Sequence, residues 1–243
     1  MSNTPPLTGQ TAVIAGGSSG IGFASGKALM ELGASVTLVG RSSNRLVDAK
    51  DRLGGTTNIA SLDLSDMAST ASFFKEHGPL DHLVLSAVSG ASLGPFIDAD
   101  NSALRETFDN KFWLYMNTLR AALAVLKENG SITMITGASA QNPVPGTTAL
   151  AAVNGALEAM IGPLAVELAP RRVNAISPGV IHTEAWDRVP AEAREINFVR
   201  AAEKTPVGTI GTADQAGQAV ASLISNPFLD GVILVVDGGL MLA

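Results

Sequence analysis

The stretch "VIAGGSSGIGFASGKAL" at positions 13–29 joins a short apolar run to an alanine-rich segment through a turn that contains several glycines. Gly16, Gly20 and Gly22 give the turn a G-x-x-x-G-x-G spacing. Glycine allows a tight turn and a close approach to a ligand, and a helix that follows presents free N–H groups and a partial positive charge. A tight turn without a ligand is the alternative. Because the turn lies between a strand and a helix, we expect it to bind a dinucleotide diphosphate. The residues expected there are Gly16, Ser18, Ser19, Gly20, Ile21 and Gly22.

The rest of the chain alternates short apolar runs with longer helical segments. The runs, rich in β-branched residues, lie at 11–15, 35–39, 82–86, 131–136, 172–177 and 231–236. The helical segments lie at 20–32, 43–53, 65–77, 100–128, 148–169 and 212–225. Such alternation predicts a Rossmann-type, doubly wound parallel sheet of about seven strands with helices on both faces. We expect one domain over residues 1–243, with Pro163 bending or interrupting its helix.

Composition narrows the class of protein. The 243 residues are 46% hydrophobic and 16% charged, which fits a well-packed α/β domain and not a disordered chain. A formal charge of −6 argues against nucleic acid and anionic membranes as partners. Cysteine is absent and three scattered histidines argue against a metal site. The N-terminus has no signal-peptide pattern and no run reaches the ~18 to 20 apolar residues of a membrane span, so we expect a cytoplasmic protein.

The end of the second strand, "VTLVGRSS", bears on the choice of cofactor. An acidic residue there would hydrogen-bond an adenosine ribose and repel a 2′-phosphate, but Gly40 takes this position and Arg41 and Ser42 follow. A guanidinium and a hydroxyl suit a phosphate. The sequence therefore favours NADP(H) over NAD(H), with a solvated loop arginine as the alternative.

Further motifs resemble those of the short-chain dehydrogenase/reductase family over nearly the whole chain. They are "GGSSGIG" (16–22), "LDL" (62–64), "FDNKF" (108–112), "AVELAPRRVNAISPGVIHTEAW" (165–186), "TPVGTIGTADQAGQAV" (205–220) and "GVILVVDGG" (231–239). The resemblance implies a small-molecule substrate, a substrate lid at about 182–205 and a homo-oligomer, either a dimer or a tetramer. It also implies further cofactor-binding residues: Asp63 and Leu64 at the adenine, Ala87 after the fourth strand, and Pro178, Gly179, Ile181 and Thr183 at the nicotinamide end.

The same resemblance implies that three of the family's four catalytic residues are missing. The family carries a Tyr-x-x-x-Lys pair in which the lysine lowers the pKa of the tyrosine, so that the phenol can exchange a proton with the substrate. In this chain Leu150 takes the tyrosine position and Asn154 the lysine position, and Gly137 takes that of the family's serine. Asn110 keeps the family's residue type, and Ser139, two residues from Gly137, could reach into the same space, so Asn110 and Ser139 are the catalytic candidates. The "N-N-A-G" motif after the fourth strand reads "LSAV" at 85–88.

A few other side chains could supply the proton in place of the family's tyrosine. Tyr115 is the only tyrosine, and helical rotation directs it away from Asn110. We expect Lys111 to be a solvated or interface lysine. His182 is the most plausible surrogate acid because imidazole is a common proton donor, but it also fits a loop histidine without a role. The Ser139 hydroxyl needs a neighbouring base.

Three functions follow from these residues. The first is an NADP(H)-binding oxidoreductase that acts on a carbonyl, an alcohol or an activated double bond through a nonstandard proton route. The second is a dinucleotide-binding sensor or partner subunit without turnover. The third is an enzyme that uses the same pocket for elimination or isomerisation.

Overall fold

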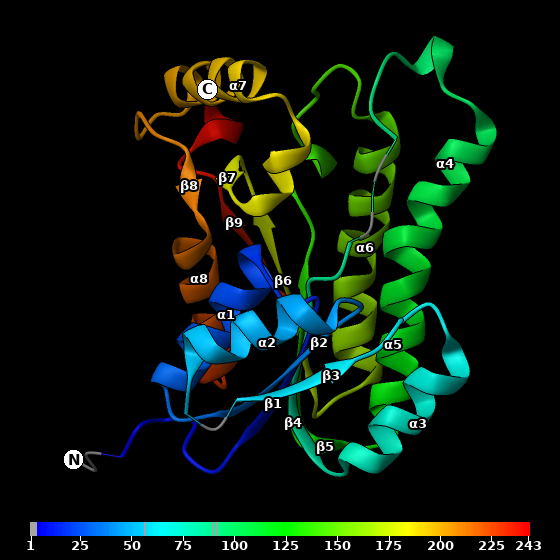
Figure 1. Ribbon diagram of the computed structural model, residues 1–243, viewed down its shortest axis with the longest axis vertical. Coiled ribbons are helices and arrows are strands. Elements are labelled where there is room, and N and C mark those ends of the chain that lie inside the picture. The colour runs from blue at the N-terminus through cyan, green and yellow to red at the C-terminus, as the bar shows by residue number, and fades with distance from the viewer. Residues whose placement is uncertain (1–3, 56, 89, 91) are drawn as a thin grey trace.

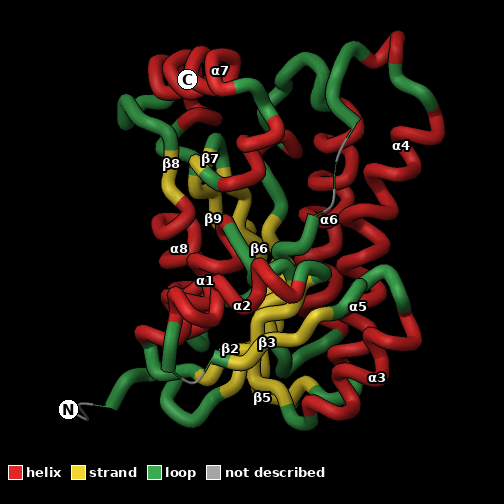
Figure 2. The backbone as a smooth tube through the Cα atoms, in the orientation of Figure 1, coloured by secondary structure: helices red, strands yellow, loops and turns green. Residues whose placement is uncertain are grey.

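The computed structural model describes residues 4–55, 57–88, 90 and 92–243 (Figure 1). The first three residues of the segment expected to lack a signal peptide lie outside this part. A seven-stranded sheet crosses the molecule and helices cover both of its faces (Figure 2). This is the Rossmann-type, single-domain α/β architecture that the alternating pattern predicts.

All seven strands of the main sheet are parallel, in the order β3-β2-β1-β4-β5-β6-β9. The strands are β1 (Thr11–Ala15), β2 (Ser35–Gly40), β3 (Asn58–Ser61), β4 (Leu80–Leu85), β5 (Leu126–Ile135), β6 (Arg172–Pro178) and β9 (Ile233–Val236). The chain reverses its direction of strand addition between β1 and β4. In open α/β sheets, ligands bind beyond the carboxyl ends of the strands at this switch point.

Two layers of helices bury the sheet (Figure 1). The helices are α1 (Gly20–Glu31), α2 (Ser43–Leu53), α3 (Met67–His77), α4 (Asn101–Phe108), α5 (Leu114–Leu123), α6 (Thr148–Glu167), α7 (Ala191–Lys204) and α8 (Ala213–Ser225). One apolar core joins the sheet to α1, α2 and α8, and a second joins it to α3, α5 and α6. Because both faces are covered, strand residues such as Val13, Ile14 and Leu83 have no exposed surface.

Short elements complete the carboxyl end of the sheet. They are the two-stranded sheet of β7 (Ile181–His182) and β8 (Gly211–Thr212), the 3₁₀ turns η1 (Phe96–Asp98), η3 (Ala138–Ala140), η4 (Glu184–Arg188) and η5 (Leu240–Leu242), and the π-helical turn η2 (Asp109–Trp113). In Figure 1, β7, β8 and α7 lie beyond the carboxyl ends of the main strands. The predicted lid therefore consists largely of η4 and α7.

The structure departs from the predicted elements in several places. The segment expected to be helical over 100–128 is divided into α4, η2 and α5, and β5 already begins at Leu126. The π-helical turn carries one additional residue per turn, so it interrupts the α-helical register between α4 and α5. The runs chosen as strands omitted β3, which is short and only partly buried. Pro163 lies inside α6 without ending it.

Helix α6 is long and apolar enough to cross a membrane by length and composition, the only such helix in the described part of the chain. Its most apolar window is 39% buried within the fold, where it packs against β6. Core helices pass the same test, so this is weak evidence for a membrane span.

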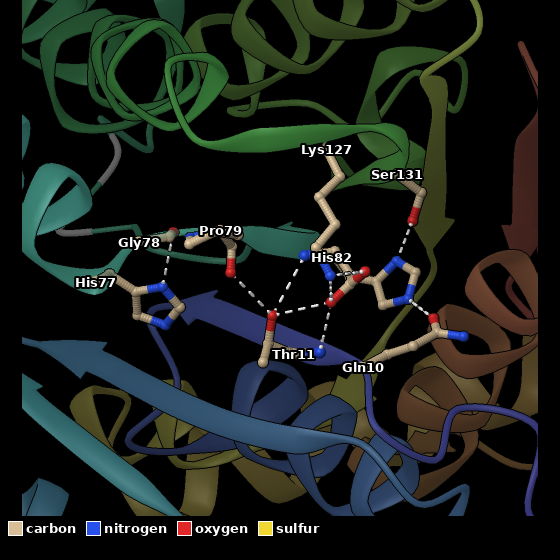
Figure 3. Close-up of polar contacts among 9 residues, drawn as sticks. Gln10, Thr11, His77, Gly78, Pro79, His82, Lys127 and Ser131 are labelled. Atoms are coloured by element: carbon tan, nitrogen blue, oxygen red, sulfur yellow. Dashed lines mark hydrogen bonds and ion pairs between the residues drawn. The ribbon is translucent and has the colours of Figure 1, made fainter.

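A polar network ties β1, β4 and β5 together near their amino ends (Figure 3). Asp81 accepts hydrogen bonds from the Thr11 N–H (2.9 Å) and from Lys127 Nζ (2.8 Å). His82 is 4% exposed, and its ring nitrogens contact Ser131 Oγ and the side-chain oxygen of Gln10. Burial lowers the pKa of His82 from 6.5 to about 4. The network therefore holds a neutral imidazole between the strands.

We predict that this imidazole makes folding sensitive to mild acid. The unfolded chain binds a proton at His82 below pH 6.5 whereas the folded protein excludes it down to about pH 4, so stability falls as the pH decreases through this window. Urea unfolding should give a loss of roughly 2 kcal/mol between pH 7 and 4.5 through this residue. His82→Gln, which does not titrate, should reduce the pH dependence by that amount. An unchanged dependence in the variant would contradict the assignment.

Candidate cofactor and active site

The glycine turn lies at the switch point of the sheet, against the end of β4. A Cβ on Gly16 would lie 2.6 Å from the backbone of Ala87, and Gly16 has a φ of +85°, in the left-handed region. A Cβ on Gly22 would collide with the carbonyl oxygen of Gly16 and lie 3.2 Å from Ser86 Oγ. The fold itself thus requires glycine at two of the predicted positions, and the close packing of the turn keeps it beside Ala87.

The turn ends in the N-terminus of α1, which no side chain of its own caps. Ser19 is the N-cap residue but makes no side-chain cap hydrogen bond. Instead, the Gly20 N–H donates to Glu184 Oε2 at 2.9 Å, and a Cβ on Gly20 would lie 3.4 Å from Thr183. Residues 183 and 184 therefore lie across the turn. A helix N-terminus attracts anions, and here a carboxylate from 164 residues away takes one of its N–H groups.

Two arginines, Arg41 and Arg45, lie near the end of β2, whereas only Arg41 was expected at the cofactor from the sequence. Arg41 is exposed, and Ser42 accepts a 3.4 Å hydrogen bond from the Arg45 N–H, which makes it the cap of α2. The Arg45 guanidinium donates to Ser19 Oγ at 2.6 Å and so reaches the glycine turn itself. Sequence reasoning missed Arg45, although its place one turn into α2 is a signal that could have found it. These groups can hold a phosphate, and Gly40 leaves no carboxylate to oppose it.

The other predicted cofactor positions surround the same strand ends. Asp63 accepts hydrogen bonds from the N–H and hydroxyl of Ser65, which lower the pKa of its carboxyl, and Leu64 is buried. On the far side, Pro178 ends β6, and a Cβ on Gly179 would lie 2.9 Å from Asp237 Cα. Ile181, in β7, is buried.

The positions that the sequence resemblance predicts to match the family's catalytic residues carry no acidic side chain. Leu150 is half-buried in the first turn of α6, and one turn later Asn154 is 2% exposed. A Cβ on Gly137 would lie 2.9 Å from Asn154 Nδ2, so the amide takes the space that a side chain at 137 would need. Ser139, half-buried in η3, accepts a hydrogen bond from Asn154 Nδ2 at 2.9 Å.

Lys111 is not the solvated or interface lysine expected from the sequence. It is 6% exposed, and its Nζ donates to Asn154 Oδ1 at 2.7 Å and to the Thr136 carbonyl at 3.0 Å. Burial lowers the pKa of its ammonium to about 7, against the opposing effect of Glu158. The cation beside the Asn154 amide thus comes from Lys111, in the π-helical turn η2 of the neighbouring segment.

Glu158 lies one turn beyond Asn154 on α6 and anchors the polar groups behind the site. It is 7% exposed and accepts hydrogen bonds from Thr136 Oγ1 and Ser177 Oγ (both 2.8 Å) and from Gln141 Nε2 (2.9 Å). Three donors satisfy a carboxylate that would otherwise be costly to bury. Through Thr136, whose carbonyl contacts Lys111, this anion and the lysine belong to one network.

Three remaining candidates lie at separate places. Tyr115 is buried and donates its hydroxyl to the Ile135 carbonyl at 3.1 Å, and burial raises its pKa, so the phenol faces the core. His182 is exposed and packs edge-on against Phe198 of α7, with ring centroids 5.1 Å apart. Asn110 is half-buried in η2, with its Nδ2 3.4 Å from Glu106 Oε1. Its catalytic role stays a prediction.

Comparisons with known proteins agree with this geometry. The family model for enoyl-(acyl carrier protein) reductase matches residues 15–241. The short-chain dehydrogenase/reductase ATR9 of Stachybotrys chlorohalonatus is 31% identical over 98% of this chain and 99% of that protein. A crystal structure of a small-chain dehydrogenase in complex with NADPH is 34% identical with a TM-score of 0.84, and covers 96% of this chain and 99% of the other.

A further likeness concerns the fold alone. The MalC reductase/Diels-Alderase from Malbranchea aurantiaca is 24% identical, with a TM-score of 0.91 over 100% of both chains. Fold and matches together define an oxidoreductase of the Rossmann type. The chain belongs to the short-chain dehydrogenase/reductase family.

We predict that two helical glycines respond oppositely to the same substitution. Gly22→Ala should destabilise the fold by about 2 kcal/mol, because its Cβ collides with the backbone of Gly16. Gly155→Ala, on α6 with nothing within 4 Å of the added Cβ, should be neutral or stabilising by up to about 1 kcal/mol. Urea unfolding measures both. Equal stabilities would show that the turn can relax away from the collision.

Proposed function

We propose that this protein is an NADP(H)-dependent oxidoreductase that reduces an activated double bond or a carbonyl without a phenolic acid. The observation that carries the proposal is the contact of Arg45 with Ser19, which brings a second cation to the turn at a strand end that has no carboxylate. The NADPH-bound relative supports the same cofactor. We expect a small molecule as the substrate.

The proposed cofactor contacts follow from this placement. The diphosphate would lie at Gly16, Ser18, Ser19, Gly20, Ile21 and Gly22, the 2′-phosphate at Arg41, Ser42 and Arg45, the adenosine at Asp63, Leu64 and Ala87, and the nicotinamide at Pro178, Gly179, Ile181 and Thr183. When bound, NADPH supplies a hydride. The protein's part is to orient the acceptor and to stabilise the atom that gains negative charge.

Ser139 is our candidate for the second task. Its Oγ accepts from Asn154 Nδ2, which leaves its own hydrogen available for a substrate atom. Leu150 and Gly137 offer no proton, and loss of a general acid costs roughly 10²- to 10⁴-fold in rate where the reaction depends on one. The site therefore favours acceptors that need little protonation, such as iminium-like or conjugated double bonds, over simple ketones.

The emptied catalytic positions also favour a second candidate, a dinucleotide-binding sensor or partner subunit without turnover. Elimination or isomerisation in the same pocket is the third. For every candidate function we propose that the protein is a homo-oligomer. The apolar residues Trp113 in η2 and Val166 on α6 are 49% and 80% exposed, and exposed apolar surface is typical of protein–protein interfaces. A cytoplasmic location is part of the proposal and is compatible with a chain that has no cysteine.

A ligand-binding comparison tests the cofactor. NADPH and NADP⁺ should raise the melting temperature more than NADH and NAD⁺, since a ligand of the folded state stabilises it in proportion to its affinity. Arg45→Ala should weaken NADPH binding by about tenfold and leave NADH nearly unchanged. Lys50→Ala, in the last turn of the same helix, is the control. The proposal fails if none of the four dinucleotides shifts the melting temperature.

Turnover separates the candidates. The oxidoreductase should consume NADPH with at least one compound from a panel of iminium salts, enones, aldehydes and ketones. A sensor should bind NADPH and consume none.

We predict that Glu184 competes with the cofactor. Its carboxylate holds the Gly20 N–H that a diphosphate would approach, so cofactor binding displaces it or places two anions together. Glu184→Gln should tighten NADPH binding by roughly 3- to 10-fold at low ionic strength, with a smaller effect at high salt. The control is Glu192→Gln in α7, which also removes one negative charge but at a position away from the glycine turn. Unchanged affinity in the Glu184 variant would refute the competition.

A further inference from the structure

Three polar side chains form a directed chain from the interior to the half-exposed Ser139. Lys111 Nζ donates to Asn154 Oδ1 at 2.7 Å, and Asn154 Nδ2 donates to Ser139 Oγ at 2.9 Å. The first two residues are 6% and 2% exposed. Lys111, Asn154 and Ser139 come from three separate segments, η2, α6 and η3, so tertiary packing brings them together.

The chemistry of the groups fixes the direction of this chain. In its protonated form Lys111 only donates hydrogen bonds, so it selects the oxygen end of the Asn154 amide. The nitrogen end then has to face Ser139, and the serine oxygen has to accept. Because the serine hydrogen is not used toward Asn154, the hydroxyl can donate it to a third group. Without Lys111, the amide could turn round and present its oxygen to Ser139, which would take up the serine hydrogen.

Burying the charged Lys111 side chain costs free energy that burying an apolar side chain in the same space would not. A buried ammonium needs partners, and here it has the Thr136 carbonyl, the Asn154 oxygen and, at longer range, the Glu158 carboxylate of α6 and the Tyr115 ring of α5. A purely structural lysine would account for the Thr136 contact. It would not account for an amide whose other end points to the half-exposed serine.

We propose that Lys111 is a positioning residue of the active site: by holding the Asn154 oxygen, it makes the Ser139 hydroxyl a hydrogen-bond donor to the substrate atom that gains charge. The lysine thus acts from η2 at the place where the family pattern has a lysine on α6. The substrate end of this chain rests on the proposed function, whereas the orientation of the amide does not.

The orientation can be measured without a substrate. In protein labelled with ¹⁵N-asparagine, the Asn154 side-chain amide is the NMR signal that Asn154→Asp removes. The wild type should show NOEs from this NH₂ group to the Ser139 β-protons and slow amide exchange with water. Lys111→Met should abolish both, whereas Lys27→Met, which removes an exposed lysine paired with Asp214, should change neither. An Asn154 signal unaffected by Lys111→Met would overturn the proposal.

Two further variants test the consequence for reduction and allow for an unstable Lys111→Met. Asn154→Asp keeps the size and a partner for Lys111, but its carboxylate only accepts, so Ser139 has to donate to it. With a compound that the wild type reduces, kcat should fall roughly 100-fold while the NADPH affinity and the KM stay within about threefold. The exchange Lys111→Asn with Asn154→Lys again places a donor beside Ser139 and should recover at least a tenth of the wild-type kcat.

The outcomes separate this inference from the proposed function. If Asn154→Asp keeps the wild-type kcat, the proposed role of Lys111 is wrong, although the consumption of NADPH would still support the proposed function. If no compound is reduced, the proposed function fails, and the NMR comparison still decides whether Lys111 orients the amide.

Discussion

The close approach of the glycine turn to the end of β4 is the constraint on which the rest of the site depends. Gly16 has no room for a Cβ beside Ala87, and Gly22 has none beside Gly16, so turn, helix and neighbouring strand are held in one arrangement. This arrangement points the first N–H groups of α1 beyond the strand ends. It also places Ser19 within reach of Arg45, so the fold's own packing prepares the cationic side of the site.

The opposite side of the site has no titrating side chain at Gly137, Leu150 or Asn154, but it has charged groups beneath it. Lys111 and Glu158 lie behind Asn154 and Ser139 and share Thr136 as a neighbour. A charge in a low-dielectric interior acts more strongly on adjacent dipoles than one in water. The cation in this part of the site comes from η2, and a neutral amide and a hydroxyl lie between it and the half-exposed edge of the site.

Local patterns allowed most of the architecture to be predicted. Apolar β-branched runs marked six strands, and the glycine spacing placed the first helix, because both signals depend on residues close in sequence. Lys111 was expected to be solvated or at an interface because lysine is usually exposed, and the partners that hold it in the interior lie 25 and 43 positions away in the chain. The contact of Glu184 with Gly20 spans 164 positions, and no local pattern encodes it. The roles of Asn110 and of the cofactor contacts remain predictions.

The Glu184 carboxylate at the N-terminus of α1 affects the dissociation of a ligand as well as its binding. Because Glu184 belongs to the protein, its local concentration at the helix end does not fall with dilution. Whenever the N-terminus of α1 is free of other ligands, the Glu184 carboxylate can accept the Gly20 N–H. A protein that uses a cofactor as a co-substrate has to exchange it after each cycle, and a tethered anion favours rapid exchange over tight retention.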